Sequence, residues 1–158
     1  GTVVMAAAII FSFKSTILKL VALAAFMPVV AGQGGVAGTQ TLTLMVRSIA
    51  LGEVSFRGSR SLVGREILLG TVNGILLGII VGIVGLIWED SLVLGLALFI
   101  AMVANMMVAA MAGAVTPLAL RAMGFDPALA SVVVVTTVTD MAGFAIFLGT
   151  ATLLLRYV

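Results

Sequence analysis

The segment from Leu92 to Leu120 contains no charged side chain and exceeds the roughly 20 apolar residues that a helix needs to cross a bilayer. Long apolar segments also occupy 16–51, 62–87 and 127–155, and a shorter one occupies 3–13. Hydrophobic residues make up 63% of the chain and charged residues 9%, and a soluble fold of 158 residues could not bury so much apolar surface. The sequence therefore predicts an all-α integral membrane protein.

These segments predict five transmembrane helices in a single transmembrane pore domain over residues 1–158. The first helix, at 3–13, is too short to cross alone and looks truncated, so a cytoplasmic regulatory region before residue 1 would be absent from this chain. The second, at 16–51, is almost twice the required length. It contains Pro28 and four glycines between residues 32 and 38, so we expect it to be kinked or broken.

The third helix carries glycines every three or four residues, at positions 70, 74, 78, 82 and 85. This spacing places the smallest residues along one face, where the backbone of another helix can approach closely. We therefore expect this face to be a helix–helix interface.

Charged residues beside the spans predict the orientation. Arginines surround the loop between the second and third helices, at positions 47, 57, 60 and 65, whereas the next loop carries Glu89 and Asp90 without a cation. Cytoplasmic loops of membrane proteins carry an excess of Lys and Arg. We expect a multi-pass protein of the cell (inner or plasma) membrane, with its N-terminus cytoplasmic and its C-terminus outside.

Asp140 is a lone carboxylate near the middle of the last helix. A charge at that depth costs several kcal/mol unless water, a cation or a partner stabilises it, so such residues usually mark an ion or proton pathway. Thr136 and Thr137 precede it by four and three residues and lie near it on one helical face, which Gly143 continues. The alternative is a protonated Asp140 that bonds to threonines or pairs with a basic residue.

The glycine-rich part of the second helix is the other candidate for chemistry. Irregular backbone at membrane depth survives only inside protein or along a wet cavity, where freed carbonyls can meet water or an ion. A close-packing kink with glutamines bonded between helices is an equal alternative, and a lone Asn in the fourth helix is more often a helix–helix hydrogen-bonding group. The candidate pore-lining or supporting residues are Thr136, Thr137, Gly143, Gly32, Gly35, Gly38, Gln33, Gln40 and Asn105.

The chain has no His and no Cys, which removes the commonest transition-metal ligands and every mechanism that depends on a catalytic histidine or thiol. An intramembrane aspartyl protease needs two catalytic Asp residues, and only Asp140 lies deep. We therefore expect a transport protein rather than an enzyme, with no nucleic-acid partner.

Two stretches resemble the MgtE family of magnesium channels. Residues 27–53 read MPVVAGQGGVAGTQTLTLMVRSIALGE and are similar to the second helix of that family. Residues 124–144 read GFDPALASVVVVTTVTDMAGF and are similar to its fifth helix. With Asn105 and Pro117 in the fourth helix, the resemblance covers nearly the whole chain in order, although Val36 stands where the family usually has Asn.

The resemblance implies a homodimeric pore in the bilayer, lined by the second and fifth helices of both chains, and regulatory domains before residue 1 in the full-length protein. It also implies that Asp140 of both chains is the metal site and holds a largely hydrated Mg²⁺. Two carboxylates balance one divalent ion, and Mg²⁺ is commonly held through few carboxylates and retained waters. Mn²⁺ and Co²⁺ would compete for the same oxygens.

Two other functions would use the same residues. A secondary transporter could exchange Mg²⁺ or another divalent cation for Na⁺ or H⁺ through the same acid and a broken helix. A non-transporting sensor or assembly module would have no ion flux. Dependence of the flux on a Na⁺ or proton gradient distinguishes the exchanger from a channel, and ion uptake into liposomes excludes the module.

Overall fold

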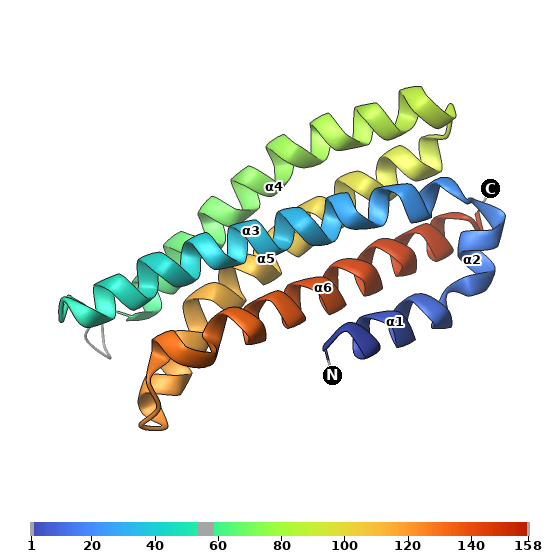
Figure 1. Ribbon diagram of the computed structural model, residues 1–158. Helices are drawn as coiled ribbons and strands as arrows, with labels where there is room; N and C mark the ends of the chain where they lie inside the picture. The colour runs from blue at the N-terminus through green and yellow to red at the C-terminus, as the bar shows by residue number, and fades with distance from the viewer. Residues whose placement is uncertain (1, 54–58, 158) are drawn as a thin grey trace.

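The computed structural model describes the backbone of residues 2–53 and 59–157 and the side chains of residues 3–53, 61–126 and 132–157. The described backbone is helical apart from short turns and contains no strand, which confirms the predicted all-α class. Its helices are α1 (Thr2–Ser12), α2 (Lys14–Lys19), α3 (Ala22–Ala50), α4 (Ser59–Glu89), α5 (Leu92–Ala122) and α6 (Pro127–Leu154) (Figure 1).

Four helices in the described part of the chain are long and apolar enough to cross a membrane, so the chain is a multi-pass membrane protein. Their apolar segments are Ala22–Ala50, Ser61–Glu89, Leu92–Ala122 and Val132–Leu154. The prediction of a fifth span is not confirmed, because α1 has only 11 residues. A helix of that length reaches about 16 Å, roughly half of the hydrocarbon core.

Of the two predicted alternatives for the second helix, kinked or broken, the structure of α3 shows that a break within the glycine-rich segment is wrong. The helix runs without interruption through Pro28 and the glycines between residues 32 and 38, and the predicted span 16–51 is divided instead near Leu20, between α2 and α3. Pro28 is the seventh residue of the helix, where it removes one backbone donor and crowds the carbonyl four residues earlier, but it does not end the helix. Glycine weakens a helix, but in lipid the helix is the local structure that satisfies every backbone polar group, so it persists.

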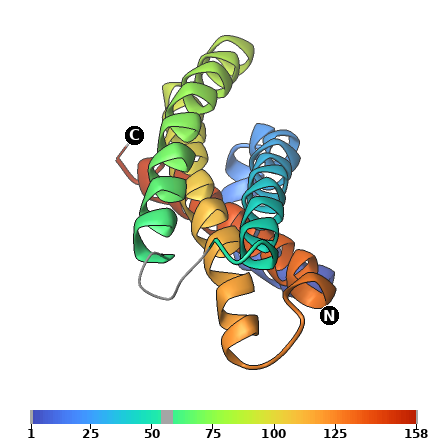
Figure 2. The same cartoon turned by 90° about the vertical axis from the view of Figure 1, so that its left-hand side faces the viewer.

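The central helix of the bundle is α5, with α3, α4 and α6 packed around it (Figures 1 and 2). Half of its span is buried inside the chain, the largest share among the four spans. The largest fully buried core side chains include Leu23, Leu94, Leu98, Met102 and Phe147. Although α3 and α4 both pack against α5, they touch each other only sparsely, and this separation leaves a groove between them.

The glycine face of α4 is confirmed as its interface with α5. A Cβ atom added at Gly70 would lie 2.8 Å from the carbonyl oxygen of Met106, and one at Gly74 would lie 2.8 Å from the Cα of Val103. Separations this short leave no room for a side chain, so glycine is what lets the two backbones approach. The other glycines of this face are buried against α5 as well, at positions 78, 82 and 85.

At one end of the bundle lie α2, the end of α6 and the turn between α4 and α5 (Figure 1). There Thr16 of α2 and Thr152 of α6 share a hydrogen bond of 2.7 Å. The short helix α1 packs along α6 and ends beside α2. The first residues of α1 therefore lie part of the way along α6 (Figure 1). The predicted orientation depends on four arginines, of which Arg57 and the side chain of Arg60 lie outside the described part of the chain, and it stays a prediction.

Candidate ion site

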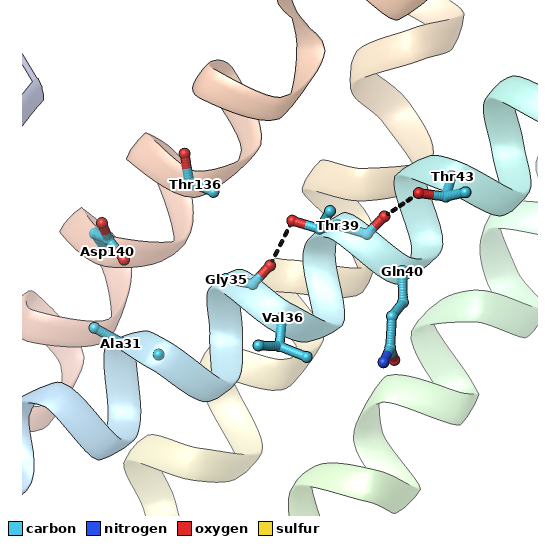
Figure 3. A pocket seen from close by; sticks show the side chains of 9 residues that line it. Ala31, Gly35, Val36, Thr39, Gln40, Thr43, Thr136 and Asp140 are labelled. Atoms are coloured by element: carbon cyan, nitrogen blue, oxygen red, sulfur yellow. Dashed lines mark hydrogen bonds between the residues drawn. The ribbon is translucent and has the colours of Figure 1, made fainter.

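A cavity of about 500 Å³ lies between α3 and α6 (Figure 3). It joins the two segments that the sequence singled out, because the glycine-rich part of α3 forms one wall and Thr136 and Asp140 of α6 form the other. The complete lining is Ala31, Gly32, Gly35, Val36, Thr39, Gln40, Thr43, Thr136 and Asp140.

The α3 wall is open because two of its residues have no side chain. A Cβ atom added at Gly32 or Gly35 would meet nothing within 4 Å, so these positions border space and not a packed neighbour. On the same wall, Val36 is 56% exposed in the single chain. The backbone of α3 is therefore accessible from the cavity along this face.

Threonines give the cavity its polar character. Thr39 Oγ1 donates to the carbonyl oxygen of Gly35 at 2.8 Å, Thr43 Oγ1 to that of Thr39 at 2.8 Å, and Thr136 Oγ1 to that of Val132 at 2.9 Å. Each hydroxyl has one proton, and once it is used in this way the oxygen offers only lone pairs. The threonine oxygens are thus suited to accept from water or to ligate a cation.

Asp140 is the acid of this cavity, and its side chain is half-buried. Within the described residues it makes no hydrogen bond and no ion pair. The alternative of an acid bonded to threonines is not what the structure shows, because Thr137 Oγ1 donates to the carbonyl oxygen of Val133 at 2.6 Å. A carboxylate at membrane depth without a protein partner needs water or a cation for stabilisation.

A second cavity, of about 350 Å³, reaches Asp140 from the α1 side. Small residues of α1, including Ala6 and Ala7, form one wall, and Thr136 and Thr137 of α6 form the other together with Asp140. Asp140 therefore lies on a ridge between two hollows, one toward α3 and one toward α1.

Behind the first cavity, Asn105 of α5 links α3 to α6. It is 1% exposed, and its Nδ2 donates to the carbonyl oxygen of Val30 at 2.8 Å, which fits the expected helix–helix role. A Cβ atom at Gly143 would lie 2.9 Å from this nitrogen, and one at Gly34 would contact the same atom. Asn105 Oδ1 is buried and has no hydrogen-bond partner among the described atoms. The amide thus occupies space that only glycine leaves free on both neighbouring helices.

The predicted site residues fall into separate places. Those on the first cavity are Gly32, Gly35, Gln40, Thr136 and Asp140, and Thr137 lies on the second. Gly38 and Gly143 are buried at helix contacts, Asn105 lies behind the cavity, and Gln33 is exposed outside both cavities. Sequence reasoning missed Thr39 and Thr43 as lining residues, although their four-residue spacing from Gly35 places all three on one helical face.

The fold and the cavity define a multi-pass helical membrane protein with an acid and hydroxyl oxygens at membrane depth, the arrangement expected of a cation transport protein. Residues 27–150 match the family model MgtE, described as a divalent cation transporter. The chain belongs to the MgtE family.

Three relatives bear the name magnesium transporter MgtE. The Enterococcus faecalis protein is 33% identical over 151 residues, which are 96% of this chain and 33% of that protein. The Thermus thermophilus protein is 33% identical over 158 residues, 99% of this chain and 35% of that protein. The Bacillus subtilis protein is 31% identical over 144 residues, 91% of this chain and 32% of that protein. The chain spans about a third of the length of these relatives, whose names agree with the expectation of a transport protein and not an enzyme.

Proposed function

We propose that this chain forms the transmembrane pore of a Mg²⁺ channel, in which two copies place Asp140 of both chains at a central ion site. The observation that carries the proposal is Asp140 itself, a carboxylate without a protein partner among the described residues, in a cavity whose other polar side chains offer hydroxyl and amide oxygens. Such a carboxylate needs a compensating positive charge at membrane depth. One divalent cation compensates two carboxylates.

The cavity wall is exposed in the single chain, and this exposure supports the proposal that a second copy packs against it. Val29, Gln33 and Val36 of α3 are exposed on or beside this wall. Polar groups there, with Asp140, would otherwise face lipid, which cannot satisfy them. A two-fold axis in front of α3 and α6 would enclose the cavity and bring the two carboxylates together.

The size and chemistry of the cavity favour a hydrated ion. A water molecule takes about 30 Å³ of liquid volume, so a shell of six waters needs about 180 Å³. The cavity of about 500 Å³ has room for such a shell. Mg²⁺ gives up water reluctantly and is commonly held by one or two carboxylates with retained waters, while Mn²⁺ and Co²⁺ share its preference for oxygen.

An exchanger would use the same Asp140 and the same helix as a channel, so the continuous α3 does not distinguish the two. The two are distinguished by Mg²⁺ uptake into liposomes that have a Mg²⁺ gradient and neither a Na⁺ nor a proton gradient. A channel takes up Mg²⁺ under these conditions without moving Na⁺ or protons outward, whereas an obligatory exchanger takes up Mg²⁺ only with outward movement of Na⁺ or protons, which is followed through the internal Na⁺ concentration and pH. We also propose that domains before residue 1 of the full-length protein regulate the pore, and that the N-terminus of this chain is cytoplasmic.

Asp140→Asn tests the ion site, with Asp90→Asn in the α4–α5 turn as the matched control. Asn keeps the size of the side chain but removes the charge, so the dimer site falls from two negative charges to none. We expect the mutant to remain folded, to lose most Mg²⁺ uptake and to lose the part of its Mg²⁺ stabilisation that comes from this site, which amounts to about 2.7 kcal/mol at 100 times Kd. Unchanged uptake with unchanged Mg²⁺-dependent stabilisation would exclude Asp140 as the ion site.

A further inference from the structure

A second polar hollow lies on the other side of α3, in the groove between α3 and α4. It has a volume of about 170 Å³, and its polar side chains come from both helices: Gln40 and Thr41 from α3, Glu66 and Asn73 from α4. Gly70 and Met106 also line it, and the absence of a side chain at Gly70 lets α4 approach α5 closely at this point.

Among the described residues, Glu66 has little compensation in this hollow. Thr41, which is 8% exposed, donates from Oγ1 to Glu66 Oε2 at 3.4 Å, a long hydrogen bond. Within the described residues Glu66 makes no other hydrogen bond and no ion pair. A half-buried carboxylate therefore keeps most of its lone pairs free toward the hollow.

The hollow extends from the membrane boundary into the hydrocarbon region. The span of α4 has 29 residues, about 43 Å at 1.5 Å per residue, so it exceeds a core of about 30 Å by about 13 Å. Glu66 lies near the start of that span and is thus close to the boundary, whereas Asn73 lies seven residues further on, about 10 Å deeper. Polar groups at such a depth need partners that lipid cannot provide.

We propose that this hollow is an accessory site for a partly hydrated divalent cation, with Glu66 as the charged ligand and Gln40, Thr41 and Asn73 as neutral oxygen ligands. One carboxylate with hydroxyl and amide oxygens is a ligand set for hard divalent ions, which commonly retain several waters. A bound ion would link α3 to α4, which otherwise touch only sparsely. Because Gln40 borders both this hollow and the α3–α6 cavity, the ion would lie beside the path that leads to Asp140.

This site is independent of the ion site at Asp140 and is tested with that site removed. In the Asp140→Asn protein, which has no cysteine, a nitroxide is attached at Leu44→Cys on the rim of the hollow, and Mn²⁺ is the probe. We expect Mn²⁺ to broaden the nitroxide spectrum, and the broadening to saturate as the Mn²⁺ concentration rises. Excess Mg²⁺ should reverse the broadening. Adding Glu66→Gln should weaken the apparent Mn²⁺ affinity at least about tenfold, the lower bound for the loss of even an outer-shell group.

Glu89→Gln, at the other end of α4, is the matched control and should leave the broadening unchanged. If Glu66→Gln fails to fold, Asn73→Leu replaces it and should also weaken Mn²⁺ binding. The proposal is overturned if Mn²⁺ does not broaden the spectrum of the Asp140→Asn protein, or if the folded Glu66 or Asn73 variant binds Mn²⁺ as before. Mg²⁺ uptake by the Asp140→Asn protein decides the ion site at Asp140 separately, so either proposal can fail alone.

Discussion

Gly35 and Gly38 are three residues apart on α3, yet substitution by alanine should affect them differently. A Cβ atom at Gly38 would lie 2.7 Å from Val135 Cγ1 and 3.4 Å from the carbonyl oxygen of Ala109, whereas one at Gly35 would meet nothing within 4 Å. Both substitutions gain about 1 kcal/mol of helix propensity. Overpacking costs about 1–3 kcal/mol, and only Gly38→Ala incurs it. Since the propensity gain cancels in the comparison, we expect Gly38→Ala to be about 1–3 kcal/mol less stable than Gly35→Ala.

The free energy of unfolding is measured by titrating the protein in mixed micelles with a denaturing detergent and following its far-UV circular dichroism. Gly32→Ala is a second control in open surroundings. The double variant Gly38→Ala/Val135→Ala tests the cause, because removing the Val135 methyl groups should make the two destabilisations less than additive. Equal stability of Gly38→Ala and Gly35→Ala, or strict additivity in the double variant, would refute the packing argument.

The remaining predictions concern the cavity and the helix junction behind it. Gly32→Val and Gly35→Val should leave the fold stable but reduce Mg²⁺ uptake into liposomes, because their side chains enter the cavity; wild-type uptake in both would show that the cavity is not the ion path. Val36→Cys should cross-link two copies in membranes, whereas Ile80→Cys on the outward face of α4 should not; equal yields would contradict the proposed axis. Asn105→Asp replaces the donor to the Val30 carbonyl with an acceptor, so thermal stability should fall and recover partly at acidic pH, when a protonated carboxyl can donate again; a loss that is independent of pH would be inconsistent with this contact.

The parts of the fold that the sequence predicted are those that local pattern determines. The glycines of α4 recur at helical spacing, and that spacing alone places them on one face, where the structure shows α5. Thr136 and Asp140 are four residues apart, which is enough to place both side chains on one wall of a cavity. Neither inference needed knowledge of a distant segment.

The parts that the sequence did not predict depend on which neighbour a helix meets. The glycines of α3 suggested a break, but the packing of Gly34 against Asn105 and of Gly38 against Val135 gives them a role in a continuous helix. Gly143 faces Asn105 and not the cavity, although it follows Asp140 by three residues. A helix that is apolar on all sides has no pattern that fixes its rotation, so the contacts of such residues come from tertiary packing.

The most direct test of the central claim is the position of Mn²⁺ in a structure of the assembled dimer, located by its anomalous X-ray scattering. If Asp140 of both chains forms the ion site, a peak should lie on the two-fold axis between the two carboxylates, and excess Mg²⁺ should displace it. The claim is contradicted if Asp140 faces lipid in the dimer, or if Mn²⁺ occupies the pore away from both Asp140 side chains.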